Sequence, residues 1–202
     1  MKLVYFGNDP LASCLEVFAK RGFSLSRVYV NSQGGGADMI SDRARRLGAQ
    51  ICGHRPDLAE MEQLVANGAE LFFSADYRYK IPLPSALRNG VNMHMSLLPR
   101  GRGPTPLPYL ISPYSDCSGL TLHKLSDELD QGDILLQQPV PLGQGETLNT
   151  LLVKMYLGAP ALLNALLEDM EHCYAQADKQ SAVESWPVPE VTSRFLDWQM
   201  TG

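Results

Sequence analysis

The stretch Leu3-Val4-Tyr5-Phe6-Gly7-Asn8-Asp9-Pro10 decides the fold of this chain. Four apolar residues that end at a glycine are typical of a short buried strand. The run Asn8-Asp9-Pro10 offers a cap and a proline at the first position of a following helix. Apolar residues then recur at helical spacing as far as Gly22, so the sequence predicts a strand that leads directly into a helix.

The same alternation continues through the first half of the chain. We expect further strands at 26–30, from Ile51 and at 70–74, with helices at 37–47 and after the capping residue Asp57. Alternation of this kind implies right-handed crossovers and a Rossmann-like α/β fold, with a mostly parallel twisted sheet and helices on both faces. Ligands of such sheets bind beyond the carboxyl ends of the strands, which draws attention to the residues that follow each strand.

The second half has a different character. Strands are predicted at 91–95, 119–125 and 134–140, a Pro-, Gly- and Arg-rich loop at 99–108, and a long helix at 146–167. The helical pattern fades from His172 onward, and the prolines near Trp186 exclude a continuous helix there. We therefore expect a catalytic domain at 1–172 and a C-terminal extension at 173–202. The extension carries enough apolar residues to pack on the domain or to form a homodimer.

Composition narrows the classes of partner. The net charge is −5, whereas a nucleic-acid-binding surface is usually basic, so no nucleic acid partner is expected. No apolar run approaches the roughly 20 residues of a membrane span, and the apolar start is too short for a signal peptide. The four cysteines form no CxxC pair, which fits free thiols in a reducing cytoplasm.

Asn92 and His94 are the first candidates for chemistry. They stand two residues apart on a predicted strand, so both side chains point to the same face of the sheet. An amide and an imidazole at the end of a strand can stabilise an oxyanion. A lone histidine is as consistent with a structural role, and spacing alone leaves both interpretations open.

An acidic turn, Asp127-Glu128-Leu129-Asp130-Gln131-Gly132-Asp133, supplies the second candidate. A cluster of acidic residues is usually a solvated turn. Asp130 differs because apolar residues on both sides place its turn against the core. A carboxylate there can orient His94 and relay a proton.

Other strand ends offer binding groups but no metal site. The first turn, Gly7 to Asp9, lacks a dinucleotide or P-loop pattern but can hold an anion. Arg102 can clamp a phosphate or carboxylate, although a solvated loop arginine is equally consistent. The remaining histidines have no partners at metal-ligand spacing, so no metal is expected and they are interpreted as structural or surface residues.

Two motifs together resemble the 10-formyltetrahydrofolate-dependent formyltransferase family. The run 92–99, Asn-Met-His-Met-Ser-Leu-Leu-Pro, looks like that family's Asn-x-His-Pro-Ser-Leu-Leu-Pro signature. The run 129–135, Leu-Asp-Gln-Gly-Asp-Ile-Leu, looks like its Leu-Asp-x-Gly-Asp-Ile-Leu loop. The resemblance covers roughly residues 1 to 170 and agrees with the predicted Rossmann-like fold.

The resemblance implies an enzyme whose catalytic residues are Asn92, His94 and Asp130. A substrate amine would attack the formyl carbon of 10-formyltetrahydrofolate, the co-substrate, while Asn92 and His94 stabilise the oxyanion and Asp130 assists proton transfer. The residues implied for the folate are Tyr77, Arg78, Tyr79, Ile81, Leu129 and Gly132. Those expected near the amine substrate are Gly7, Asn8, Asp9 and Arg102.

Some residues depart from the family pattern. Met95 replaces the usual proline, and Arg78 stands where methionyl-tRNA formyltransferases usually have a small residue. Too little chain follows the catalytic half for the C-terminal barrel of those tRNA enzymes. The segments 73–79 and 119–123 look more like the amino-sugar N-formyltransferases, which predicts a nucleotide-linked amino sugar as the substrate.

Two other functions are consistent with the same residues. One is formyl transfer to another amine, such as glycinamide ribonucleotide or an aminoacyl group on a carrier. The other is a folate- or nucleotide-binding module that has lost its activity, which the intact Asn92, His94 and Asp130 argue against.

Overall fold

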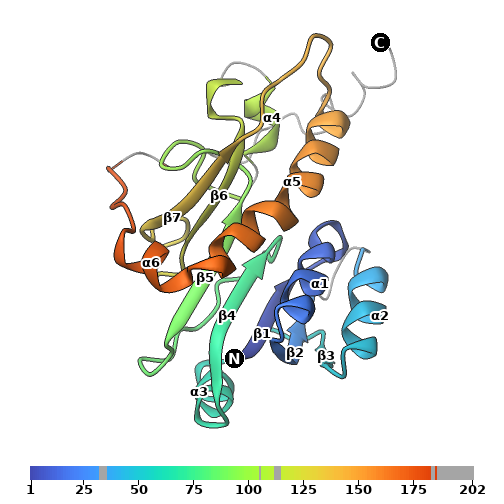
Figure 1. Ribbon diagram of the computed structural model, residues 1–202, viewed down its shortest axis with the longest axis vertical. Helices are drawn as coiled ribbons and strands as arrows, with labels where there is room; N and C mark the ends of the chain where they lie inside the picture. Colours follow the sequence, from blue (N-terminus) through green and yellow to red (C-terminus); the bar gives the residue numbers. More distant parts are fainter. Residues whose placement is uncertain (32–35, 105, 112–114, 183–184, 186–202) are drawn as a thin grey trace. The chain divides into compact units, whose positions relative to one another are not determined.

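A computed structural model describes residues 1–31, 36–104, 106–111, 115–182 and 185. The chain divides into two compact units (Figure 1). Unit 1 consists of Met1–Met93 and Lys124–Glu128, and unit 2 consists of His94–His123 and Leu129–Gly202. The predicted tail residues Trp186, Phe195 and Trp198 lie outside the described residues.

Unit 1 contains the predicted parallel sheet. Its strands follow the order β3-β2-β1-β4-β5, and all four pairings between neighbours are parallel. The strands are β1 (Lys2–Gly7), β2 (Ser24–Tyr29), β3 (Gln50–Cys52), β4 (Ala69–Ala75) and β5 (Asn89–His94). This doubly wound order brings the carboxyl ends of β1 and β4 together at the centre of the sheet, which confirms the expected fold class.

Helices cover the two faces of this sheet. The helical elements of unit 1 are η1 (Asp9–Leu11), α1 (Ser13–Lys20), α2 (Asp38–Arg46) and α3 (Leu58–Ala66). Phe18 of α1 meets Phe73 edge to face at 5.0 Å, whereas Met61 of α3 is buried in a core cluster with Phe72. Neighbouring residues of β4 point to opposite faces, so α1 and α3 lie on opposite sides of the sheet.

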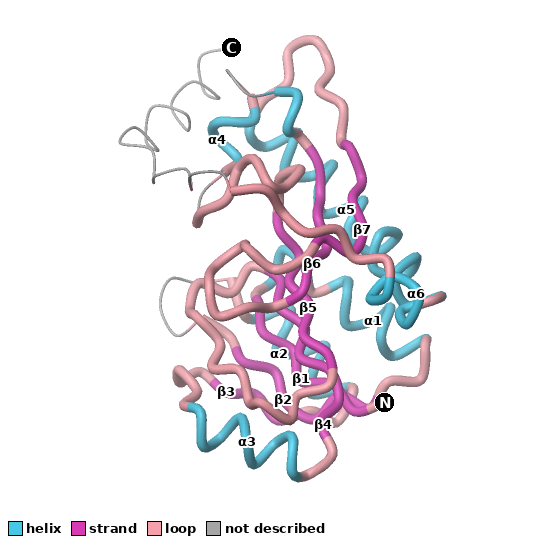
Figure 2. Tube along the Cα trace, turned by 90° about the vertical axis from the view of Figure 1, so that its left-hand side faces the viewer, coloured by secondary structure: helices cyan, strands magenta, loops and turns pink. Residues whose placement is uncertain are grey.

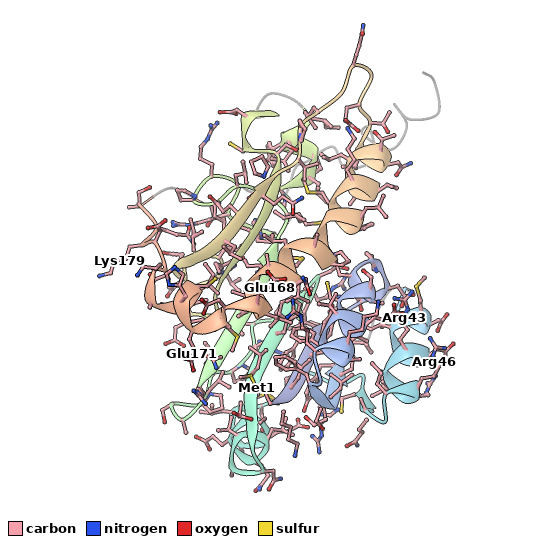
Figure 3. The ribbon with its side chains drawn as sticks, viewed as in Figure 1. Met1, Arg43, Arg46, Glu168, Glu171 and Lys179 are labelled. Atoms are coloured by element: carbon pink, nitrogen blue, oxygen red, sulfur yellow. The ribbon has the colours of Figure 1, made fainter. Side chains whose placement is uncertain are left out.

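Local capping fixes the start of α3 as the sequence predicts. Asp57 caps α3 by accepting a hydrogen bond from the backbone N–H of Glu60 at 2.8 Å. The cationic side chains of α2 gather near its carboxyl end, where Arg43 and Arg46 extend from the helix (Figure 3). Cations there complement the helix dipole.

Unit 2 is built on an antiparallel strand pair. Its elements are α4 (Leu107–Leu110), η2 (Ser115–Cys117), β6 (Gly119–Lys124), β7 (Ile134–Pro139), α5 (Leu148–Glu168) and α6 (Met170–Ala175), and Figure 2 separates the strands from the helices by colour. β6 and β7 pair with Gly119 opposite Pro139 and Leu122 opposite Leu136. Thr147 caps α5 by accepting the backbone N–H of Thr150.

α5 has the length and mean hydropathy of a helix that could cross a membrane. The expectation that no apolar segment approaches that length is therefore corrected. Its buried residues follow a helical spacing and include Leu151, Met155 and Leu163, each with no exposed surface. That pattern is typical of the core helix of a globular unit.

Regular structure also continues past the point where the sequence pattern fades. α6 runs across residue 172, which the fading pattern did not predict. Beyond α6, the backbone of Asp178 pairs with that of Ile134 through two hydrogen bonds of 2.8 and 2.9 Å. This pairing is a long-range contact, and local periodicity carries no signal for it.

Candidate functional site

β5 presents the two residues expected to stabilise an oxyanion. Asn92 lies opposite Ser74 of β4, and His94 is the last residue of the strand. The two side chains project from the same face of the strand because they stand two residues apart. The imidazole of His94 is buried, with 8% of the residue exposed.

The turn after His94 is anchored to β6 and β7 by Thr121 and Gln137. The Thr121 hydroxyl donates to the carbonyl of Ser96 at 2.6 Å and accepts the N–H of Leu98 at 3.1 Å. The Gln137 amide donates to the Leu98 carbonyl at 2.8 Å and to the Thr121 hydroxyl at 2.9 Å. The Ser-Leu-Leu-Pro turn is thus held rigidly next to His94.

The backbone carbonyl of Gly101 fixes one edge of the His94 ring. Nε2 of His94 lies 2.7 Å from this oxygen, and Ser96 Oγ lies 3.3 Å from it. A carbonyl oxygen can only accept, so Nε2 carries the proton in this arrangement. The other ring nitrogen, Nδ1, faces a different group.

That group is the carboxylate of Asp130. Oδ1 of Asp130 lies 3.5 Å from Nδ1 of His94, and Oδ2 accepts the backbone N–H of Gly103 at 3.0 Å. Asp130 has a φ of 56°, in the left-handed region that aspartate tolerates better than most residues. Its turn therefore aims the carboxylate back at the loop that also holds the imidazole.

His123 joins the same carboxylate, although its sequence context gave it only a structural or surface role. Its Nε2 lies 3.7 Å from Asp130 Oδ1, and its ring centre is 6.5 Å from that of His94. The residue is 2% exposed. Its position on β6, two residues after the buried Thr121, is the signal that would have placed it on the face of the strand toward the Asp130 turn.

Arg102 is also close to this pair. The residue is only 3% exposed, and its guanidinium donates to the Gln180 side chain and to the carbonyl of Ser181. Burial lowers the pKa of Arg102, and the charge of Asp130 opposes that shift. The sequence was consistent with an arginine that binds a phosphate or carboxylate or with a solvated one. In the structure its guanidinium instead donates hydrogen bonds to other parts of the protein.

The turn after β1 is held by neighbouring loops of unit 1. Asn8 donates to the carbonyl of Asp76 at 3.3 Å and accepts the N–H of Asn31 at 3.2 Å. Asp9 accepts the N–H of Ile40 at 2.8 Å, in the first turn of α2. The side chains of Asn8 and Asp9 therefore have structural partners, whatever contact they make with a substrate.

Gly7 is required for the same turn. A Cβ on this residue would lie 2.2 Å from the backbone oxygen of Ala75. β1 and β4 therefore approach each other at their carboxyl ends more closely than any side chain permits.

The segment after β4 packs its aromatic residues inward. Tyr77 contacts Phe6 with ring centres 5.5 Å apart, and Ile81 is 6% exposed within the same core. Burial raises the pKa of Tyr77 to about 12. Arg78 is exposed, and the Tyr79 ring stacks edge to face on Tyr77. The segment therefore presents backbone groups, the exposed Arg78 and the partly exposed Tyr79 to its surroundings.

The two remaining residues implied for the folate flank Asp130. Leu129 is 64% exposed, although the side chain of its neighbour Asp130 is only 13% exposed. Gly132 is buried, and its carbonyl accepts a hydrogen bond from Gln180 at 2.6 Å. Within the described parts of the chain, no cluster of three or more His, Cys, Asp or Glu residues could hold a metal ion.

The formyl transferase family model matches residues 57–164, more than half of the chain. This span contains both sequence motifs and the His94–Asp130 pair. The chain belongs to the formyl transferase family.

A curated member of the family is similar over much of this chain. The methionyl-tRNA formyltransferase of Bordetella avium is 34% identical over 160 residues, which cover 74% of this chain and 50% of the relative. The chain spans half or less of the length of the curated relatives that it matches.

Solved structures of formyltransferases share the fold. The phosphoribosylglycinamide formyltransferase of Bacillus halodurans has a TM-score of 0.66 at 22% identity, with 87% of this chain and all of that chain covered. The N-formyltransferase of Helicobacter canadensis, in complex with folinic acid and dTDP-3-aminofucose, has a TM-score of 0.63 at 18% identity. In that comparison, 92% of this chain and 69% of the other are covered. These matches agree with the predicted Rossmann-like fold class.

Proposed function

We propose that this formyl transferase moves a formyl group from 10-formyltetrahydrofolate to a primary amine. The observation that carries the proposal is the contact between His94 Nδ1 and Asp130 Oδ1, supported by both family motifs. A buried imidazole beside a carboxylate can store and deliver one proton where an amine is acylated.

The folate supplies an activated formyl carbon, to which the acceptor nitrogen bonds as the bond to the folate nitrogen breaks. In the reaction, Nε2 of His94 exchanges the carbonyl of Gly101 for the formyl oxygen as the acceptor of its proton, and Asn92 from the same strand donates a second hydrogen bond to that oxygen as it gains negative charge. Asp130 holds the imidazole and accepts the proton that the amine loses, and that proton then moves to the departing folate nitrogen. Removal of one such oxyanion donor commonly lowers kcat by about 10²–10³.

Backbone groups are the best candidates to hold the folate. The side chains of Tyr77 and Ile81 are occupied in the core of unit 1, which leaves the backbone of 77–81 and the side chains of Arg78 and Tyr79. In unit 2, taken by itself, the exposed Leu129 offers an apolar surface for a flat ring beside Asp130. This assignment follows the family resemblance and the observed burial.

A nucleotide-linked amino sugar is the acceptor that we favour. The net charge of −5 disfavours a long phosphate backbone, and the sequences at 73–79 and 119–123 resemble amino-sugar enzymes. In the proposal the turn Gly7 to Asp9 lies on the side of this substrate, whereas the buried Arg102 supports the loop that holds the His94–Asp130 pair. The chain would then act in the cytoplasm, where reduced folate and nucleotide sugars are available, and no membrane or nucleic acid partner would be needed.

Formyl transfer to an aminoacyl-tRNA is the second candidate. The observation that favours it is the 34% identity to a methionyl-tRNA formyltransferase over 160 residues. Glycinamide ribonucleotide and carrier-bound aminoacyl groups complete the set of acceptors that share the same amine chemistry.

Release of tetrahydrofolate from 10-formyltetrahydrofolate tests the proposal. The chain is incubated with dTDP- and UDP-linked amino sugars, glycinamide ribonucleotide, methionyl-tRNA and an aminoacyl carrier, each in a separate reaction. We expect release with an amino sugar and a loss of about 10²–10³ in kcat for His94→Ala. His172→Ala, which changes an exposed histidine, is the matched control.

Two results would overturn parts of the proposal. If His94→Ala releases tetrahydrofolate as fast as the unaltered chain, the proposed mechanism is wrong. Release with methionyl-tRNA and with no amino sugar would replace the favoured acceptor with the second candidate, and no release with any amine would leave a binding module.

A further inference from the structure

The segment after α6 contributes a side chain that reaches the candidate site. The backbone of Asp178 is paired with that of Ile134, at the start of β7. This pairing places Gln180, two residues later, beside the turn that carries Asp130. Figure 3 shows the neighbouring Lys179 extending from the outer side of this segment.

The amide nitrogen of Gln180 holds the Asp130 turn. Nε2 donates to the carbonyl of Asp130 at 2.9 Å and to the carbonyl of Gly132 at 2.6 Å. Both carbonyls belong to the turn in which Asp130 adopts its left-handed φ of 56°. Aspartate tolerates this conformation better than most residues, and the two hydrogen bonds from Gln180 hold the turn in it.

The amide oxygen of Gln180 holds the other loop of the site. Oε1 accepts from Nε of Arg102 at 3.0 Å and from Nη2 at 2.7 Å, and the carbonyl of Ser181 accepts from Nη2 at 3.0 Å. Arg102 stands between the two residues that position the pair, Gly101 and Gly103. The carbonyl of Gly101 binds Nε2 of His94, and the N–H of Gly103 binds Oδ2 of Asp130.

We propose that Gln180 is a positioning residue that joins the two loops on which the His94–Asp130 pair depends. Its effect on catalysis rests on the proposed function, whereas its effect on loop order does not. One neutral amide serves this purpose because it presents a donor edge to two carbonyls and an acceptor edge to a guanidinium. None of these contacts involves the reacting atoms, so Gln180 acts through its neighbours.

Two substitutions test the hydrogen bonds that the Gln180 amide donates separately from those that it accepts. Gln180→Met keeps the length of the side chain and removes every hydrogen bond. Gln180→Glu keeps an acceptor for Arg102 but removes both donors to the Asp130 turn. Lys179→Met is the matched control, because it places the same new side chain on an exposed neighbouring residue.

Amide hydrogen exchange of Gly103, followed by NMR on the full chain, reports the order of the loop without an activity assay. In Gln180→Met we expect the protection of this amide to fall by about tenfold or more, because the Asp130 carboxylate that accepts it becomes mobile. Lys179→Met should keep the protection of the unaltered chain. Equal protection in Gln180→Met and the unaltered chain would overturn the proposal.

Kinetics with the acceptor found active test the catalytic consequence. We expect Gln180→Met and Gln180→Glu to lower kcat by about tenfold to a hundredfold while the KM values for amine and folate change little, since misplacement of reacting groups affects the turnover step. Gln180→Glu could instead show the Gly103 protection and the kcat of the unaltered chain. That result would mean that residue 180 only anchors Arg102, and it would overturn the proposal that Gln180 holds the Asp130 turn.

The test of Gln180 can be distinguished from the test of the proposed function. If the unaltered chain releases no tetrahydrofolate with any amine, the proposed function fails, and the exchange of Gly103 still decides the positioning role. If Gln180→Met does not fold, as judged by its thermal transition, the same measurements on Gln180→Glu decide it.

Discussion

Asp130 accepts the backbone N–H of Gly103 through one carboxylate oxygen and faces His94 Nδ1 with the other, at 3.0 and 3.5 Å. The opposite ring nitrogen of His94 donates to the carbonyl of Gly101. The carbonyl of Gly101 and the N–H of Gly103, on either side of Arg102, therefore fix the two members of the pair. Because Nε2 already carries a proton, the Nδ1–Oδ1 contact is attractive only when a second proton lies between the two groups.

Replacement of this carboxylate tests its role without disturbing the turn. We expect Asp130→Asn to lower kcat by about 10²–10⁴, because the amide keeps the shape and tolerates the left-handed conformation but cannot take up a proton. Steady-state kinetics and thermal unfolding of the same sample separate the two effects. Asp130→Ala should lose about 1–3 kcal/mol of stability in addition, because alanine resists a φ of 56°. Turnover by Asp130→Asn equal to that of the unaltered chain would contradict the role in proton transfer.

Substitution of Gly7 tests the close approach of β1 and β4. Gly7→Ala should destabilise unit 1 by about 1–3 kcal/mol, because its Cβ would meet the backbone oxygen of Ala75 at 2.2 Å. Denaturant unfolding measures the loss. Gly53→Ala is the matched control, since nothing lies within 4 Å of a Cβ at that residue. Equal stability of the two variants would mean that β1 moves away from β4 without cost.

Much of unit 1 was predictable because its signals are local. Apolar runs, glycines and a capping aspartate fixed the strand and helix order, and the observed α3 begins after Asp57 as expected. The sequence also predicted a carboxylate that can orient His94, and the structure has His94 Nδ1 and Asp130 Oδ1 3.5 Å apart, while the catalytic roles of the two residues stay predictions.

The contacts that sequence did not predict are long-range. His123 was indistinguishable from a structural histidine until its strand was placed beside the Asp130 turn. Gln180 lies in a segment without periodicity, and its hydrogen bonds join residues 48 to 78 positions apart. The sequence left Arg102 as a solvated or ligand-binding residue, because it does not show that Gln180, 78 positions later, accepts hydrogen bonds from its guanidinium.

Thiol labelling tests the burial of the cysteines. Cys14 has no exposed surface, and burial raises its pKa to about 12, so it should resist alkylation at pH 8 in the folded chain. Cys52 and Cys117 are also buried, whereas Cys173 is half-buried. Mass spectrometry after iodoacetamide treatment should show one slow adduct, which Cys173→Ser removes, and four adducts after unfolding. Rapid labelling of Cys14 in the folded chain would contradict the packing of α1.

The start of α5 should make the stability of the chain depend on pH at the acidic end. Glu146 accepts the N–H of Gly143 at 2.8 Å and also contacts Lys154 and Thr150. These hydrogen bonds, led by that of Gly143, lower the pKa of Glu146 to about 2. The folded chain binds this proton less tightly than the unfolded chain does. Ionised Glu146 therefore stabilises the fold fully at pH values above its ordinary pKa of 4.5. This contribution is lost as the pH falls toward the folded-state pKa of about 2.

Glu146→Gln should therefore lower the free energy of unfolding at pH 7 by about 1–3 kcal/mol, through loss of charge-assisted hydrogen bonds. The difference from the unaltered chain should narrow as the pH falls from 5 to 2, because protonation removes the same charge. Denaturant unfolding at several pH values measures both quantities. Glu62→Gln, which changes an exposed glutamate of α3 in the same way, is the matched control. A difference at pH 2 as large as that at pH 7 would mean that Glu146 stabilises α5 through its shape and not through its charge.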